Sequence, residues 1–210
     1  MQIHYRIQRF IIKNLLRIYI RLTVKGKENV PSQGSVLVAA NHCSYLDPPL
    51  LGLGFPRQIT YLAKEELFSI PFLGWWLKSV GSYPVARGKG DIRVLKAALR
   101  LLKEDKTLLI FPEGTRSSDG QLQTLENGLA WLALKTGVAV LPVYTADTFR
   151  LYPRSARFPK PGLVRFLVGD PIIPVLDKDA DFSEQVNCLT AQIESALKSL
   201  EAKVKNSATE

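Results

Sequence analysis

Short apolar runs alternate along the chain with segments in which apolar residues recur every three or four positions. Runs bounded by glycine, proline or polar turns are typical of buried strands, and the longer spacing is typical of helices. We therefore predict strands at 35–40, 58–63, 82–86, 107–111, 138–146, 163–169 and 172–175. We predict helices at 3–22, 47–53, 91–104, 125–136 and 181–203, with two short helical pieces inside 65–80.

This alternation indicates an α/β protein with a mixed, largely parallel central sheet flanked by helices. We divide the 210 residues into an N-terminal amphipathic helix at 1–24 and one globular domain at 25–205. Ligands of such sheets gather at the carboxyl ends of the strands. Three turns, at 41–47, 87–90 and 112–118, each follow a predicted strand, and we expect them to share one site.

The first 27 residues contain seven Lys or Arg and no Asp or Glu, whereas the rest of the chain carries 21 basic and 19 acidic residues. One face of the predicted helix is aliphatic, and another carries a ladder of Arg9, Lys13, Arg17 and Arg21. Such a helix is suited to lie on an anionic membrane. A helix packed on the domain is the commoner alternative. The aliphatic face argues against an arm that binds nucleic acid, so we expect membrane lipids rather than nucleic acid as the partner.

Cysteine and histidine are scarce in this chain. Cys43 and Cys188 lie far apart, which suggests no disulfide framework, and with only two histidines we expect no metal site. This usage suits a reducing, cytosol-facing setting. Neither a secretory signal nor an apolar stretch long enough to span a bilayer is recognisable. We therefore expect peripheral or monotopic attachment at the cytoplasmic face of a membrane.

The strand predicted at 35–40 ends in Asn41 and His42, and Asp47 follows five residues after the histidine. An imidazole at the end of a strand, with a carboxylate in reach to fix its tautomer, is suited to general-base catalysis. The other histidine, His4, lies in the N-terminal segment. A structural role fits the same residues: Asp47 followed by two prolines starts a helix, and His42 is then a turn residue.

The other two turns carry groups that bind anions. Arg87 and Arg116 offer planar guanidinium groups that hold phosphate oxygens bidentately. Gly114 lets a ligand approach the backbone, and the amides around Gly114 and Thr115 are candidates for stabilising an oxyanion. The chain has no G-x-S-x-G elbow, and we do not expect Cys43 to act as a nucleophile. Direct activation of a substrate hydroxyl is therefore favoured.

Four sequence blocks resemble those of the lysophosphatidic acid acyltransferase (PlsC-type) family. The blocks are Asn41-His42-x4-Asp47, Arg87 after a strand, Phe111-Pro112-Glu113-Gly114-Thr115-Arg116-Ser117, and Val140-Leu141-Pro142-Val143. The resemblance spans about residues 25–175. It implies acyl transfer from an acyl-CoA or acyl-carrier-protein thioester to the free hydroxyl of 1-acylglycerol 3-phosphate, giving phosphatidic acid, with no cofactor and no metal.

The resemblance also implies roles for seven residues. His42 is the general base and Asp47 supports it. Substrate binding falls to Arg87, Glu113, Gly114, Thr115 and Arg116, of which the two arginines hold the phosphate. Two alternatives stay open: the same reaction on glycerol 3-phosphate or another lysolipid, and a non-catalytic domain that binds anionic lipid.

Two segments bear on the choice between these alternatives. Many family members carry a basic residue before the glycine that follows the FPEGTRS block, whereas here the stretch is Leu125-Glu126-Asn127-Gly128. This departure argues against a bare phosphate as the acceptor head group. Between 148 and 170, basic and aromatic residues are interleaved with no acidic residue before Asp170. Lipid head groups, the phosphates of coenzyme A, or simple solvation each explain that stretch.

Overall fold

The computed structural model describes residues 7, 10–11, 14, 19–85 and 92–206. The elements, in which η marks a 3₁₀-helix, are β1 (Ile20–Lys25), η1 (Lys27–Asn29), β2 (Val36–Ala40), α2 (Asp47–Gly54), β3 (Ile59–Lys64), η2 (Glu65–Ser69), α3 (Leu73–Ser79), β4 (Tyr83–Val85), α4 (Ile92–Lys103), β5 (Thr107–Ile110), α5 (Gly128–Thr136), β6 (Val140–Ala146), α6 (Thr148–Leu151), β7 (Gly162–Val168) and α7 (Phe182–Asn206).

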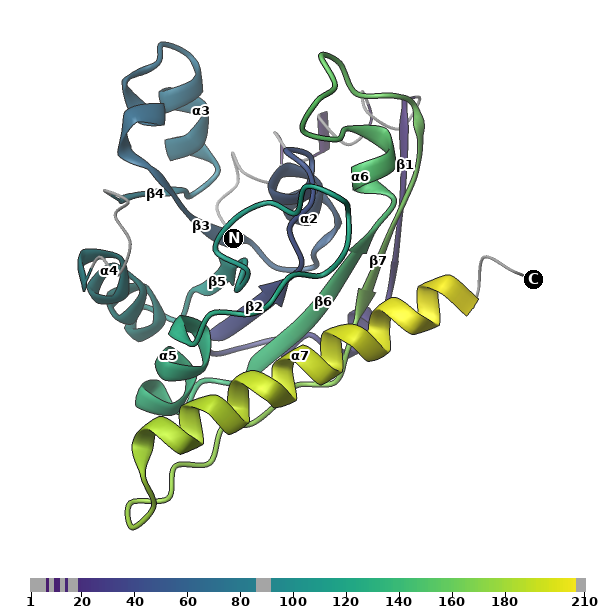
Figure 1. The fold of residues 1–210 in the computed structure, drawn as a ribbon. Coiled ribbons are helices and arrows are strands. Elements are labelled where there is room, and N and C mark those ends of the chain that lie inside the picture. The colour runs from purple at the N-terminus through teal and green to yellow at the C-terminus, as the bar shows by residue number, and fades with distance from the viewer. Residues whose placement is uncertain (1–6, 8–9, 12–13, 15–18, 86–91, 207–210) are drawn as a thin grey trace.

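The described part of the chain forms a seven-stranded sheet in the order β1-β7-β6-β2-β5-β3-β4 (Figure 1). Neighbouring strands are parallel except β6 and β7, which are antiparallel. This is the mixed, largely parallel sheet that the sequence predicts. Because β2 pairs in parallel with both β5 and β6, the segments that leave these three strands emerge at one edge of the sheet.

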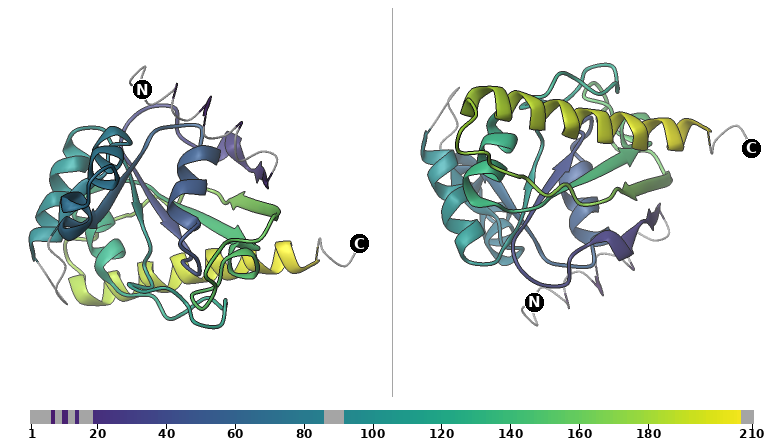
Figure 2. Two further views of the ribbon diagram at one scale, coloured as in Figure 1. Left: turned by 90° about the horizontal axis from the view of Figure 1, so that it is seen from above. Right: turned by 90° about the horizontal axis from the view of Figure 1, so that it is seen from below.

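The central strand β2 shows why its sequence reads as a continuous apolar run. All five of its residues are buried. Leu37 and Ala39 belong to a core with α4, α5 and α7, while Val36, Val38 and Ala40 belong to a core with α2 on the opposite face. Figure 2 shows the sheet between these two layers. A strand covered on both faces needs apolar residues at every position, and this burial anchors the turn that follows.

The expected helix over 3–22 is wrong at its carboxyl end, because β1 begins at Ile20. This strand pairs in parallel with β7, in the register Ile20 opposite Gly162. Its burial alternates along the strand, as expected for an edge strand with one covered face. The aliphatic residues of β1 also continue the three- and four-residue spacing of the preceding segment. The sequence pattern therefore does not mark the change from helix to strand.

Two other local predictions are corrected. The strand expected at 172–175 is reduced to an isolated bridge between Val140 and Ile172. Pro171 and Pro174 flank the isoleucine pair and lack the N–H that a ladder needs. In addition, the helix α6 forms in a stretch for which no element was predicted. It follows Asp147, which adopts the left-handed conformation with φ of 73°.

The N-terminal prediction is tested at only a few positions. Ile7, Phe10, Ile11 and Asn14 are helical and exposed, whereas Arg9, Lys13 and Arg17 lie outside the described residues. The amphipathic helix over 1–24 therefore stays a prediction. None of the helices in the described ranges is long and apolar enough to cross a bilayer.

Candidate active site

The turn after β2 is fastened to the end of β6 by the side chain of Asn41. This buried amide donates from Nδ2 to the carbonyl of Thr145 at 3.0 Å, and its Oδ1 accepts the Thr145 N–H at 2.6 Å. An amide that pairs both as donor and as acceptor mimics one more rung of the ladder between the two strands. His42, the next residue, therefore starts from a fixed backbone position.

His42 and Asp47 are in contact, as the sequence predicts. The imidazole Nδ1 lies 2.9 Å from Oδ2 of Asp47, whose side chain is 0% exposed, whereas that of His42 is 17% exposed. The same Oδ2 accepts the backbone N–H groups of Cys43 at 2.8 Å and Ser44 at 2.7 Å. The carboxylate is thus held by the turn itself and by the start of α2. It binds Nδ1 of the ring, and Nε2 has no hydrogen-bond partner among the described residues.

Asp47 does not cap α2, as the structural alternative would require. The N-cap is Leu46, which makes no side-chain capping bond, and Asp47 is the first residue of the helix. Its Oδ1 is buried without a hydrogen-bond partner among the described residues. The contacts of this carboxylate therefore orient the imidazole and the turn.

Glu113 connects the 112–118 loop to the histidine turn through the backbone of His42. Oε1 of Glu113 accepts the His42 N–H at 2.6 Å, and Oε2 accepts the Gln123 N–H at 2.9 Å. In the reverse direction, the N–H of Ser117 donates to the His42 carbonyl at 2.8 Å. Burial raises the pKa of Glu113 from an ordinary 4.5 to about 7, although the hydrogen bonds from the Gln123 and His42 amides oppose this shift. Glu113 therefore positions the base through its backbone, whereas Asp47 holds its ring.

Phe111 covers one face of the imidazole. The two ring centroids are 3.9 Å apart and the planes are inclined by 17°. The side chain of Cys43 is buried, and its Sγ lies 3.2 Å from Oγ1 of Thr148. Burial raises the pKa of this thiol to about 12. A thiol that stays protonated is no nucleophile, in agreement with the sequence prediction.

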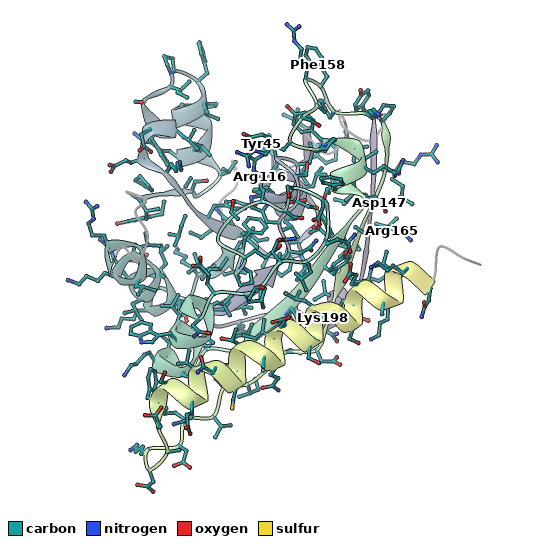
Figure 3. All side chains as sticks on the ribbon, viewed as in Figure 1. Tyr45, Arg116, Asp147, Phe158, Arg165 and Lys198 are labelled. Atoms are coloured by element: carbon teal, nitrogen blue, oxygen red, sulfur yellow. The ribbon has the colours of Figure 1, made fainter. Side chains whose placement is uncertain are left out.

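Arg116 lies beside the same turn. Its guanidinium carbon is 3.5 Å above the centroid of the Tyr45 ring (Figure 3), an arrangement typical of a cation–π contact. Its Nη1 is buried and has no hydrogen-bond partner within the described ranges. A buried guanidinium N–H without an acceptor is suited to bind an anion, as the predicted phosphate site requires.

Gly114 and Thr115 are both exposed in the loop between Glu113 and Arg116. Gly114 has φ of 67°, which explains the glycine. Its N–H donates to the carbonyl of Phe111 at 3.1 Å. This amide is therefore engaged within the loop, and an oxyanion role for the amides around Gly114 and Thr115 stays a prediction. Arg87, the remaining predicted site residue, lies outside the described residues.

The fold and the site place this chain among mixed α/β proteins with a His–Asp pair at the carboxyl edge of the central sheet. The family model for the acyltransferase domain matches residues 21–146, and the chain belongs to the acyltransferase family. The structure of the 1-acyl-sn-glycerophosphate acyltransferase PlsC from Thermotoga maritima is similar, with a TM-score of 0.73 and 28% identity over 98% of this chain and 85% of that one.

Three curated relatives show the range of similar sequences. The 1-acyl-sn-glycerol-3-phosphate acyltransferase of Bacillus subtilis is 30% identical over 92% of this chain and 94% of its own length. The chloroplastic LPAT1 of Arabidopsis thaliana, with the same named activity, is 35% identical over 73% of this chain, which spans 44% of that protein. The lyso-ornithine lipid O-acyltransferase of Pseudomonas aeruginosa is 41% identical over 51% of this chain and 42% of its own length.

Several residues that shape the site were not singled out from the sequence. Phe111 and Ser117 lie within the FPEGTRS block, and Tyr45 lies within the histidine turn, so a signal was present in each case. Their roles arise from contacts between the two loops, which spacing along the chain does not reveal. Gln123 contributes only its backbone N–H, for which a sequence carries no signal.

Proposed function

We propose that this protein transfers an acyl group from an acyl thioester to the free hydroxyl of 1-acylglycerol 3-phosphate, giving phosphatidic acid. The 2.9 Å contact between His42 Nδ1 and the buried Asp47 carboxylate carries the proposal, because it leaves Nε2 as the nitrogen that can act as a base. Membership of the acyltransferase family and the named activities of the Bacillus and Thermotoga proteins support the reaction class.

In the proposed mechanism, Nε2 of His42 removes the proton of the acceptor hydroxyl while its oxygen attacks the thioester carbonyl. Asp47 stabilises the imidazolium that results. The tetrahedral intermediate collapses with cleavage of the C–S bond, and the imidazolium returns the proton to the leaving thiolate. Arg116 binds the acceptor phosphate. The donor is acyl-CoA or acyl-carrier protein, and the reaction takes place at the cytoplasmic surface of a membrane without a metal or a resident cofactor.

A second acceptor class is favoured by one observation. A Cβ on Gly114 would lie 2.8 Å from Oε1 of Glu126, so this carboxylate lies directly against the loop that carries Arg116. Glu126 is exposed and forms no ion pair within the described part of the chain. A negative charge there disfavours a bare phosphate and favours an acceptor that also carries an ammonium group. The similarity to a lyso-ornithine lipid O-acyltransferase agrees with this alternative.

The test is a panel of acceptors with the purified protein. Thiol release from acyl-CoA and from acyl-carrier protein is measured with no acceptor, lysophosphatidic acid, glycerol 3-phosphate or lyso-ornithine lipid. We expect release only with a lysolipid, and we expect His42→Ala to lower kcat by at least about 10³-fold with an unchanged circular dichroism spectrum. If His42→Ala retains most of the activity, His42 is not the base.

The Glu126→Lys variant separates the two acceptor classes. Replacing the carboxylate by an ammonium group should change the ratio of the kcat/KM values for lysophosphatidic acid and lyso-ornithine lipid by about tenfold in favour of the phosphate. The matched control is Glu104→Lys, a charge reversal in the turn that follows α4, which should leave that ratio unchanged. If both variants give the wild-type ratio, Glu126 does not contact the head group.

A further inference from the structure

An apolar tip extends from the sheet between η2 and α3. Phe72 is 87% exposed and Trp75 is 68% exposed, and Ile70 beside them is also exposed. Phe72 has φ of 62°, a conformation that is a genuine outlier for a bulky residue. A fold that holds a large apolar ring in water on a strained backbone indicates that the ring has a partner.

The shape of this tip is fixed by its backbone. The N–H of Gly74 donates to the carbonyl of Ile70 at 2.8 Å, and a Cβ on Gly74 would lie 2.1 Å from the carbonyl oxygen of Phe68. Only glycine allows α3 to pack this closely on η2. The exposure of the aromatic rings is therefore a property of a defined hairpin, residues 65–79.

A second exposed element is the loop at 153–161, which follows α6. Phe158 is 71% exposed, and Arg154, Arg157 and Lys160 are exposed around it. None of these three cations forms an ion pair with a described carboxylate. By contrast, Arg165 contacts Asp147 at 2.9 Å. The loop therefore combines a solvated aromatic ring with three uncompensated positive charges.

The hairpin and the loop rise on the same side of the molecule, beyond the carboxyl end of β2 (Figure 1). Figure 3 places Phe158 at the top of the molecule, with Tyr45 and Arg116 below it, toward the hairpin. The loop also adjoins the N-terminal segment, because the Tyr19 hydroxyl donates to the carbonyl of Pro159 at 2.7 Å. Both apolar elements thus flank the edge of the sheet at which the site opens.

We propose that Ile70, Phe72 and Trp75 of the hairpin, together with Arg154, Arg157, Phe158 and Lys160 of the loop, form one docking surface for an anionic phospholipid bilayer. The rings enter the interface and the cations contact lipid head groups. This docking surface would turn the site toward an acceptor that is dissolved in the bilayer. The inference rests on the proposed function, because only an enzyme that acts on a lipid needs its site to face a bilayer.

Charge distinguishes this surface from another exposed apolar segment. Ile173 and Val175 are 65% and 82% exposed, but the stretch that contains them, 170–181, carries four aspartates and one lysine. Such a segment is repelled by anionic lipid. Its residues therefore provide matched controls with similar exposure and opposite electrostatics.

The experiment measures binding of the full chain to vesicles of equal phosphatidylglycerol and phosphatidylcholine, and to pure phosphatidylcholine. The triple variant Arg154→Gln, Arg157→Gln, Lys160→Gln should bind the anionic vesicles about 100-fold more weakly at low salt. The variant Phe72→Ser, Trp75→Ser should lose about tenfold on both vesicle types, with little salt dependence. The controls are Ile173→Ser, Val175→Ser and the charge-matched triple Lys103→Gln, Lys178→Gln, Lys203→Gln.

Acylation of a short-chain, monomeric lysophosphatidic acid is measured in parallel and should be unchanged in the hairpin and loop variants. Wild-type vesicle binding by these variants, or equal losses in the controls, overturns the docking surface. A loss of acylation of the monomeric acceptor in the loop variant also overturns it, because the cations then bind a substrate phosphate. If the wild type binds vesicles as expected but acylates no acceptor, the catalytic proposal fails while the docking surface stands.

Discussion

Replacing Asp47 by Asn tests whether the buried carboxylate supports the imidazole or only the turn. Oδ2 of Asp47 accepts three hydrogen bonds, two from the backbone amides of Cys43 and Ser44 and one from His42 Nδ1. An asparagine oxygen at the same place keeps the two amide bonds. The same oxygen still accepts from His42 Nδ1 and keeps the tautomer of the ring. What is lost is the negative charge that stabilises an imidazolium.

The expected magnitude follows from these contacts. A hydrogen bond to a charged group contributes about 1.5–3 kcal/mol, so loss of the charge should lower kcat by about 10–10²-fold at unchanged KM. The asparagine NH₂ would occupy the position of Oδ1, which is buried without a described partner. An unpaired buried donor there should lower the free energy of unfolding by about 1–3 kcal/mol.

The assay combines steady-state kinetics with urea unfolding of the same samples. Asp47→Ala serves as the comparison, because it removes the acceptor of both amides as well and should destabilise the protein more than Asp47→Asn does. A kcat within threefold of wild type in a folded Asp47→Asn protein would refute the reasoning. The carboxylate would then be a purely structural acceptor for the turn.

Three further predictions concern the same site. Because the folded pKa of Glu113 is raised from 4.5 to about 7, the folded state retains a proton that the unfolded chain releases between these pH values. The free energy of unfolding should therefore fall by about 3 kcal/mol as pH rises from about 4.5 to about 7 and then stay level. Urea unfolding of Glu113→Gln should lack this fall. Tyr45→Leu removes the ring under Arg116 and should raise the acceptor KM about threefold to tenfold, with kcat within twofold, whereas Tyr45→Phe should behave as wild type; equal KM values for both would contradict the cation–π role. In native protein treated with iodoacetamide at pH 8, peptide mass spectrometry should find Cys188 alkylated and Cys43 intact, because Cys43 is buried with a pKa of about 12; equal labelling would show that the turn opens.

The sequence predicts the sheet well where one strand is covered on both faces. β2 is such a strand, and its apolar run marks both its position and its central place. Edge elements are harder, because half of their residues face water and the pattern becomes ambiguous. β1 therefore looked like the continuation of a helix, and the segment around Ile172 looked like a strand although two prolines prevent a ladder.

The site shows the same division. The pairing of His42 with Asp47 and the approach of Glu113 and Arg116 follow from turns at the carboxyl ends of parallel strands, a rule that the sequence exposes. The individual partners do not follow from that rule. Two examples are the hydrogen bond from the Gly114 amide to the Phe111 carbonyl and the contact of the Arg116 guanidinium with Tyr45. Both depend on loop geometry that only the folded chain defines.

Contacts with neighbouring residues fix both the backbone and the ring of His42. Its N–H and carbonyl are bound to the 112–118 loop, Phe111 covers one ring face, and Asp47 fixes Nδ1. Such preorganisation fixes the direction of Nε2 but gives it no means of distinguishing one hydroxyl from another. Under the proposed function, selection among acceptors therefore falls to other side chains. We expect Arg116 to favour an anion and Glu126 to favour a cation, so that these two residues together select the head group.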